Sequence, residues 1–392
     1  MSEPITPLRV DPRFTDRERQ PGLDLLRALA IIVVVIYHAG IMGFPMPGRV
    51  HRWGWIGVDL FFVLSGYLIG GQLMSAARSR THSELACNQP INLKRFFARR
   101  ALRIMPAYFV ILAIYIFLPS WREYPEMYPW WKFLLSIQNI ALHGGTAFSH
   151  AWSLAVEDQF YLTLPFILLF VNRWPRAAII LPCVIFVAGI FLRTFLASQH
   201  PAEISGVAFR DYQAWIYYPT WTRLDPLVFG VALAAIEKFR PQWWKRLMDS
   251  AVWLWLPGLA LIVFALWLGE GEYLTITSVI CQFPLLAIAF AALLVCVQSD
   301  RLPLRRVRIP GAAFIASIAY SAYLVQKLVI HFVGQFCLDH DIALTSTSAL
   351  IGVELCVYAV AALLFLAVER PFLQLRHRIA RRELAAPQAA RS

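Results

Sequence analysis

The chain has 392 residues, of which 59% are hydrophobic and only 15% are charged, and its mean hydropathy is +0.57. A soluble domain usually has about 45–50% apolar and roughly 25% charged residues, so the composition excludes an ordinary soluble protein. The net charge of +12 does not indicate nucleic-acid binding, because the basic residues lie in short segments between apolar runs. Six cysteines without a CxxC pair predict neither a metal site nor a disulfide framework.

Ten apolar runs follow one another along the chain. In an open chain only helices satisfy every backbone polar group within lipid, so each run predicts one helix. The expected fold is all-α, a polytopic membrane bundle of about ten transmembrane helices. The predicted spans are 24–43, 55–75, 104–119, 151–171, 177–196, 221–237, 251–268, 274–297, 312–336 and 346–368.

The basic residues are unevenly divided between the two sides of this bundle. With the N-terminus inside, 27 of the 36 Lys and Arg residues fall in cytoplasmic segments and five in external ones, which predicts that both termini are cytoplasmic. The chain should comprise a tail at 1–20, one transmembrane domain at 21–372 and a basic tail at 373–392. The external segments 120–150 and 197–220 are rich in Trp, Tyr and Pro. An interfacial aromatic belt explains them better than a sugar-stacking platform does.

Two ionisable side chains in the first span are candidates for function, because a charge in lipid is costly. Arg27 and His38 are 11 residues apart, which places them within about 20° of one helix face and about 16 Å apart along its axis. Asp59 lies near the external end of the second span, at a depth that matches His38. A carboxylate beside a histidine raises its basicity, so we expect Asp59 to orient His38 as a catalytic base. The alternative is a structural pair that joins two helices.

Further arginines precede the third span. Arg100 and Arg103 are one helical turn apart and face the same way. Two arginines suit phosphate groups, so together with Arg27 they predict a cytoplasmic anion site. Ordinary basic charge at the cytoplasmic side is the alternative explanation.

Other polar residues gather toward the external half of the predicted bundle. Glu157 shares a helix face with Ser153 and is a third catalytic candidate. A transporter would also place polar residues there. The candidate substrate-binding residues are Trp152, Ser153, Arg223, Asp225 and Tyr323.

Taken in order, these motifs resemble the acyltransferase-3 family of membrane O-acyltransferases. One position departs from the family, because Gln326 stands where members often have His, which puts an acid–base role there in doubt. The matching segments are Arg27-x10-His38, residues 57–69, Arg100-x-x-Arg103, residues 152–161, Tyr320–Leu324 and Val368–Phe372.

The resemblance implies a helix bundle in the bacterial inner membrane that acylates, and most often acetylates, glycans. It implies that acyl-CoA is the donor, bound on the cytoplasmic side, with function on Arg27, His38, Arg100, Arg103 and Glu157. The expected mechanism has the arginines hold the CoA phosphates while His38, oriented by Asp59 or Glu157, acts as base on the acceptor hydroxyl. A covalent acyl-histidine remains open.

Three other functions stay open at this point. The chain could transport or flip a lipid-linked glycan, acylate a small metabolite, or serve as a scaffold. A scaffold leaves the polar residues within the spans unexplained, and a transporter does not require Arg27 and His38 on one face. Acyl length, acceptor identity and oligomeric state are not encoded in any pattern that we can interpret.

Overall fold

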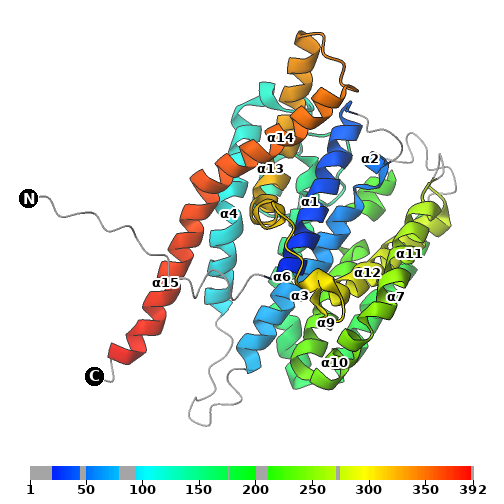
Figure 1. The fold of residues 1–392 in the computed structure, drawn as a ribbon, viewed down its shortest axis with the longest axis vertical. Coiled ribbons are helices and arrows are strands. Elements are labelled where there is room, and N and C mark those ends of the chain that lie inside the picture. The colour runs from blue at the N-terminus through cyan, green and yellow to red at the C-terminus, as the bar shows by residue number, and fades with distance from the viewer. Residues whose placement is uncertain are drawn as a thin grey trace, which may run out of the picture.

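The computed structural model describes residues 20–44, 50–78, 93–174, 176–199, 211–270 and 274–389. Within these ranges the fold is all-α and no strand forms, as the sequence predicts (Figure 1). The longer helices are α1 (Pro21–Ile41), α3 (Ile56–Arg78), α4 (Leu93–Phe117), α6 (Trp152–Arg173), α7 (Ala177–Gln199), α9 (Leu224–Phe239), α11 (Ala251–Leu268), α12 (Ile276–Gln298), α13 (Ala312–Asp339), α14 (Thr347–Leu364) and α15 (Arg370–Ala389). The short ones are α2 (Val50–Trp53), η2 (Pro119–Trp121), α5 (Trp130–Leu134), η3 (Ser149–Ala151), η4 (Gln213–Tyr217), η5 (Thr220–Thr222), α10 (Pro241–Asp249), η6 (Pro303–Arg305) and η7 (Phe365–Glu369).

Nine helices in the described ranges are long and apolar enough to cross a membrane. They correspond to nine of the ten predicted spans. The remaining predicted span, 221–237, forms α9, whose 16 residues fall short of the roughly 20 that a bilayer requires. α9 packs against α3, α7 and α12 inside the bundle, so it is a core helix whether or not it crosses the bilayer completely.

The outward faces of the helices fit a lipid surround. Large apolar side chains are widely exposed there, including Phe117 at 77%, Phe191 at 73% and Trp253 at 80%. Water would disfavour such a surface, whereas lipid tails do not. Together with the nine long helices, this makes the chain a multi-pass integral membrane protein.

α1 and α3 occupy the middle of the bundle (Figure 1). α1 packs on α3 and α13, and α3 packs on α9. Glycines permit these close contacts: a Cβ on Gly57 would come within 2.4 Å of the Ala30 carbonyl oxygen, and one on Gly66 within 2.1 Å of the Leu227 carbonyl oxygen. Small residues at such crossings let helix backbones approach each other, so α3 is fixed on both sides.

The predicted external segment 120–150 folds into the bundle rather than lying over it. Phe133, Gln138 and Asn139 are buried. Asn139 donates to the Tyr218 carbonyl oxygen at 3.2 Å, and the Gln159 amide of α6 donates to the Ser136 carbonyl oxygen at 2.7 Å. Irregular backbone at membrane depth must be satisfied within the protein, and these side-chain amides supply its partners.

The C-terminal segment is a continuous rod of α14, η7 and α15 that extends past the rest of the bundle (Figure 1). Most of the basic tail predicted at 373–392 is therefore helical, since α15 runs to Ala389. Glu369, in η7, is buried and accepts a hydrogen bond from Ser321 of α13 at 2.9 Å. This bond joins the middle of the rod to the core.

Candidate active site

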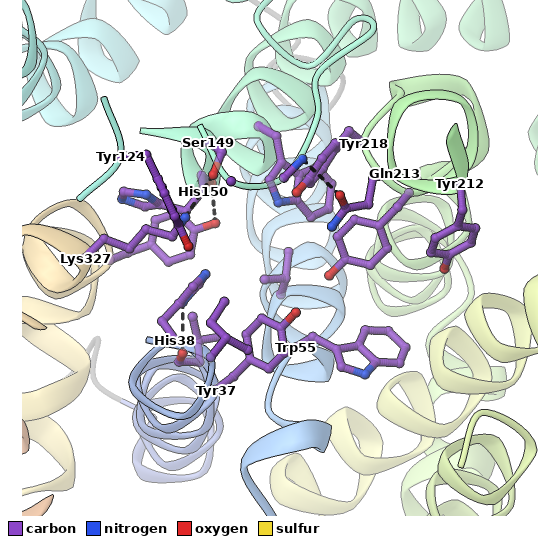
Figure 2. A pocket seen from close by; sticks show the side chains of 18 of the residues that line it. Tyr37, His38, Trp55, Tyr124, Ser149, His150, Tyr212, Gln213, Tyr218 and Lys327 are labelled. Carbon is purple, nitrogen blue, oxygen red and sulfur yellow. Dashed lines mark hydrogen bonds between the residues drawn. The ribbon is translucent and has the colours of Figure 1, made fainter. Parts of the chain in front are cut away.

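The described residues line two cavities that contain predicted site residues. We call the first the histidine pocket; it has a volume of about 190 Å³ and is lined from α1, α3, α13 and the segments before α6 and α9 (Figure 2). We call the second the arginine pocket; it has a volume of about 170 Å³ and is lined from α1, α3, α4, α6, α13 and η7. The first contains His38, near the C-terminal end of α1, and the second contains Arg27, near its N-terminal end. The two pockets therefore occupy opposite halves of the bundle, as the spacing along the first span predicts.

His38 is held by one of its two ring nitrogens. Nδ1 lies 3.0 Å from the Val34 carbonyl oxygen, one turn earlier on α1, and 3.3 Å from Gln326 Oε1. The Gln326 amide nitrogen donates to the Tyr323 carbonyl oxygen at 3.1 Å, which fixes Oε1 toward the histidine. Both partners of Nδ1 are acceptors, so Nδ1 carries the proton of the neutral ring and Nε2 keeps its lone pair. The ring is thus set up as a base.

This arrangement corrects the expected partner of His38. Asp59 and Glu157 were each predicted to orient the ring, but a backbone carbonyl and Gln326 do so. The reason is that Nδ1 already faces the preceding turn of its own helix, and α13 rather than α3 supplies the second acceptor. Gln326, whose role the sequence left in doubt, is a direct neighbour of the candidate base.

A buried cation lies on the wall of the same pocket. Lys327 is 4% exposed, donates to Ser149 Oγ at 2.8 Å, and has its Nζ 3.9 Å from Glu123 Oε1. His150 also lines the pocket, with its ring centroid 6.0 Å from that of His38. Figure 2 shows these side chains gathered at one end of the cavity. Neither Lys327 nor His150 was among the predicted site residues.

The backbone just before α6 brings Ser149 and His150 into the pocket. Phe148 has φ = 59°, in the left-handed region that a bulky side chain seldom adopts. Aromatic packing holds it there, because its ring stacks on Tyr115 with centroids 4.6 Å apart and on Phe133 at 5.5 Å. Such strained residues persist only where the surrounding structure fixes them, and they cluster at functional sites.

The aromatic residues of the predicted external segments are divided between two environments. Four tyrosines of these segments line the histidine pocket, namely Tyr124, Tyr212, Tyr217 and Tyr218. Other aromatic residues of these segments are exposed on the outside of the bundle, namely Trp121, Trp130, Trp131 and Trp215. The interfacial belt therefore suits the exposed tryptophans, whereas the tyrosines form a polar aromatic wall inside the bundle.

The arginine pocket brings together the three predicted anion-binding residues. Arg27, Arg100 and Arg103 all line it. Arg27 pairs with Asp24 at 3.2 Å, and the Arg100 guanidinium lies 3.5 Å from the centre of the Tyr161 ring. Three guanidinium groups around one cavity provide donors in the geometry that phosphate oxygens accept.

Glu157 belongs to this pocket and not to His38. Its carboxylate accepts from Ser65 at 2.7 Å and from Tyr161 at 3.0 Å, and it lies 3.4 Å from Arg100 Nη2. Both carboxylate oxygens of Glu157 already have partners in the arginine pocket. This position supports a role in holding the side chains of that pocket in place. The predicted role of Glu157 in orienting His38 does not fit this geometry.

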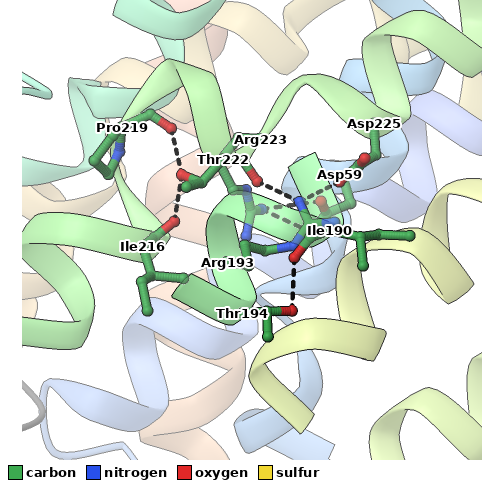
Figure 3. Close-up of polar contacts among 9 residues, drawn as sticks. All are labelled: Asp59, Ile190, Arg193, Thr194, Ile216, Pro219, Thr222, Arg223 and Asp225. Atoms are coloured by element: carbon green, nitrogen blue, oxygen red, sulfur yellow. Dashed lines mark hydrogen bonds and ion pairs between the residues drawn. The ribbon is translucent and has the colours of Figure 1, made fainter. Parts of the chain in front are cut away.

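Asp59 lies in a buried charged cluster next to the histidine pocket (Figure 3). Arg223 Nη2 donates to both of its carboxylate oxygens, at 2.9 and 3.0 Å. Beside this pair, Arg193 Nη1 contacts Asp225 at 2.5 Å and the Thr222 carbonyl oxygen at 2.8 Å. The four side chains tie α3, α7 and the start of α9 together.

This cluster corrects three predicted roles. Arg223 is 0% exposed, Asp225 2% and Asp59 0%, and none of the three lines either pocket. Arg223 also lies 3.8 Å from the centre of the Phe283 ring, behind the wall of the histidine pocket. Direct substrate binding by Arg223 and Asp225 does not fit this burial. The structural pair considered as the alternative for Asp59 is what forms, with Arg223 as the partner.

The remaining predicted substrate-binding residues do line cavities. Trp152 lines the histidine pocket, Ser153 the arginine pocket and Tyr323 both. Of the residues that the prediction missed, Lys327 had a usable signal, because a lysine inside an apolar span is costly unless it serves a purpose. His150 had none, since it precedes its span.

Comparison with known proteins shows the family of the chain. Residues 20–368 match the family described as "Acyltransferase domain". A peptidoglycan O-acetyltransferase, OatA, of Listeria monocytogenes is 30% identical over 57% of this chain and 35% of its own length. A putative O-acetyltransferase of Staphylococcus aureus strain MSSA476 is 27% identical over 84% of this chain and 54% of its own length.

A further relative is the O-acetyltransferase OatA of Staphylococcus aureus strain NCTC 8325, 32% identical over 55% of this chain and 34% of its own length. The chain thus spans between about a third and a half of the length of these curated relatives. No solved structure matches it. Because the match covers nearly the whole chain, from before α1 into η7, this protein belongs to the acyltransferase-3 family.

Proposed function

We propose that this protein is a membrane-embedded O-acyltransferase. It moves an acyl group from acyl-CoA, held in the arginine pocket, to a hydroxyl of a glycan or glycolipid in the histidine pocket. The observation that carries the proposal is the geometry of His38, whose Nδ1 is occupied by Val34 and Gln326 while the ring lines a cavity. Acetyl is the expected acyl group and a glycan the expected acceptor, because the relatives named above are O-acetyltransferases and the one from Listeria monocytogenes is named for peptidoglycan.

The chemistry follows from this arrangement. His38 Nε2 takes the proton of the acceptor hydroxyl as that oxygen attacks the thioester carbonyl. The new C–O bond forms, the C–S bond breaks, and the proton passes from Nε2 to the departing CoA sulfur. A positioned base typically contributes about 10²–10⁴-fold to such a step.

Lys327 supplies the electrostatic part. Its ammonium carries three donors, one of which is given to Ser149, and it lies on the same cavity wall as His38. Negative charge develops on the carbonyl oxygen during attack, and a cation in a water-poor site stabilises that charge strongly. Glu123 and Ser149 hold the lysine in place.

The test uses purified protein in liposomes with acetyl-labelled acetyl-CoA and N-acetylglucosamine oligosaccharides as acceptor. Wild type should release CoA and transfer label, and His38→Ala should lose transfer by at least about 10²-fold while it still binds acetyl-CoA. His331→Ala is the matched control, because His331 lies on α13 but lines neither pocket.

Each rival gives a different result in this assay. A glycan flippase would move a labelled lipid-linked glycan across the bilayer without consuming acetyl-CoA. An enzyme for small metabolites would release CoA but label only a soluble acceptor. If His38→Ala transferred the acetyl label as fast as wild type, His38 would not be the catalytic base.

A further inference from the structure

The histidine pocket and the arginine pocket are adjacent, and two residues line both of them. Of the side chains that line the cavities in the described ranges, Val58 and Tyr323 alone line both. A second layer lies beside them: Phe62 lines the arginine pocket, Trp152 lines the histidine pocket, and their rings meet edge to face with centroids 5.9 Å apart. The wall between donor and acceptor cavities is therefore thin, and Val58 and Tyr323 form its centre.

The hydroxyl of Tyr323 makes two hydrogen bonds that hold the side chain in this wall. Its oxygen lies 2.6 Å from Ser153 Oγ and donates to the His150 carbonyl oxygen at 2.7 Å. The residue is 6% exposed, and its own carbonyl oxygen anchors Gln326, which in turn holds His38. The ring thus lies between the residues of the arginine pocket and the candidate base.

Val58 cannot move back from the wall. It is 5% exposed and sits in the first turn of α3. The adjacent Gly57 already packs against α1, where a Cβ would come within 2.4 Å of the Ala30 carbonyl oxygen. The backbone of α3 is fixed there, so only side-chain size at position 58 sets the space opposite Tyr323.

We propose that Val58 and Tyr323 form the passage that the acyl group crosses to reach His38, and that their side chains determine which acyl groups the enzyme uses. The inference rests on the proposed function, in which phosphates bound by Arg27, Arg100 and Arg103 place CoA on one side and His38 acts on the other. The acyl end of the donor must then pass between these two side chains. A narrow acetyl group needs the least displacement, and a group branched at its second carbon needs the most.

The experiment compares acetyl-CoA, propionyl-CoA and isobutyryl-CoA as donors for the protein in liposomes. We expect wild type to prefer acetyl-CoA. Val58→Ala should raise kcat/KM for isobutyryl-CoA relative to acetyl-CoA by roughly tenfold or more, since hydrophobic contacts discriminate one methylene by about 10–200-fold. The matched control is Val35→Ala, which shortens a buried valine of α1 that lines neither pocket.

A blocking variant and a hydroxyl variant complete the test. Val58→Phe should abolish transfer of every acyl group while acetyl-CoA still binds. Tyr323→Phe removes both hydrogen bonds of the hydroxyl and should also raise kcat/KM for isobutyryl-CoA relative to acetyl-CoA. Its control, Tyr320→Phe, removes a hydroxyl on the same helix that donates to the Ile104 carbonyl oxygen and lines the arginine pocket only.

The outcomes separate the two proposals. If wild type transfers no acyl group from any acyl-CoA, the proposed function fails and this inference falls with it. If wild type transfers acetyl but Val58→Ala and Tyr323→Phe keep the wild-type donor preference, the passage lies elsewhere and the proposed function stands. If Val58→Phe does not fold, the changes in preference of the other two variants decide the question.

Discussion

His38 and Gln326 form a direct contact between α1 and α13, with Nδ1 3.3 Å from Oε1. The Gln326 amide is in turn fixed on the Tyr323 carbonyl oxygen. Since the Val34 carbonyl oxygen is the other acceptor for Nδ1, the contact fixes both the tautomer and the direction of the ring. The first prediction follows from this contact.

Gln326→Met keeps the size of the side chain but removes the acceptor. We expect kcat to fall by about two- to tenfold with little change in KM, because a typical hydrogen bond is worth about 0.5–1.5 kcal/mol. Gln326→Glu keeps an acceptor oxygen and should retain more activity than Gln326→Met. Steady-state kinetics with acetyl-CoA check both. Equal activity in wild type and Gln326→Met would show that Val34 alone orients His38.

The Asp59–Arg223 pair should matter for stability rather than for the base. Removing one partner of a buried pair typically costs about 3–5 kcal/mol, because the other charge stays buried and unpaired. Asp59→Ala should therefore lower the thermal stability of the purified protein strongly, and the double variant Asp59→Ala/Arg223→Met should recover a large part of it. If Asp59→Asn instead kept normal thermal stability but lost kcat, Asp59 would act on His38 in catalysis.

Arg103 should contribute to donor affinity. Arg103→Gln is expected to weaken acetyl-CoA binding by roughly tenfold or more, the size expected for a lost hydrogen bond to a charged group. The affinity of wild type should also fall with added salt, since exposed charges are screened within about 10 Å at 0.1 M. Calorimetric titration measures both effects. Arg301→Gln is the control, because Arg301 pairs with Asp249 on the surface and lines neither pocket; equal loss in both variants would point to non-specific charge.

Lys327 should act on the chemical step. Lys327→Met removes the cation but keeps most of the aliphatic stem, and we expect kcat to fall by about 10²-fold with KM little changed, a loss similar to that of one oxyanion-stabilising donor. Lys132→Met is the control, because Lys132 lies near the Tyr128 ring and lines neither pocket. A loss in KM alone would place Lys327 in acceptor binding.

The orientation of the bundle is tested by cysteine labelling. Cysteines at Ser120 and Gln242, both exposed, should react with a membrane-impermeant maleimide from opposite sides, with Ser120 labelled from outside. The reason is the uneven division of basic residues between the two sets of loops. Thr146 is unsuitable as the external position because it is 3% exposed within the folded segment before α6. Labelling of both positions from the same side would contradict the predicted topology.

The class of fold was readable from the sequence because one physical rule dominates it. Lipid cannot hydrogen-bond a backbone, so long apolar runs must be helices, and their number and order follow directly. α9 shows the limit of this rule: its run of apolar residues predicts a helix, but length alone does not show whether a 16-residue helix crosses the bilayer.

Along a single helix the sequence also determined geometry. Arg27 and His38 lie on α1 in opposite halves of the bundle, one in each pocket, because helical rise and rotation are fixed per residue. Arg100 and Arg103 share a pocket for the same reason. Such predictions need no knowledge of how helices are arranged around one another.

Which side chains meet between helices was decided only by the tertiary structure. Asp59 was predicted to lie at the depth of His38, yet it pairs with Arg223, just before α9, and His38 contacts Gln326 of α13 instead. Depth is encoded along the chain, but the rotation of each helix and the choice of its neighbours depend on packing over the whole bundle. The buried turn at Phe148, which brings His150 to the pocket, likewise exists because the rings of Tyr115 and Phe133 stack on Phe148.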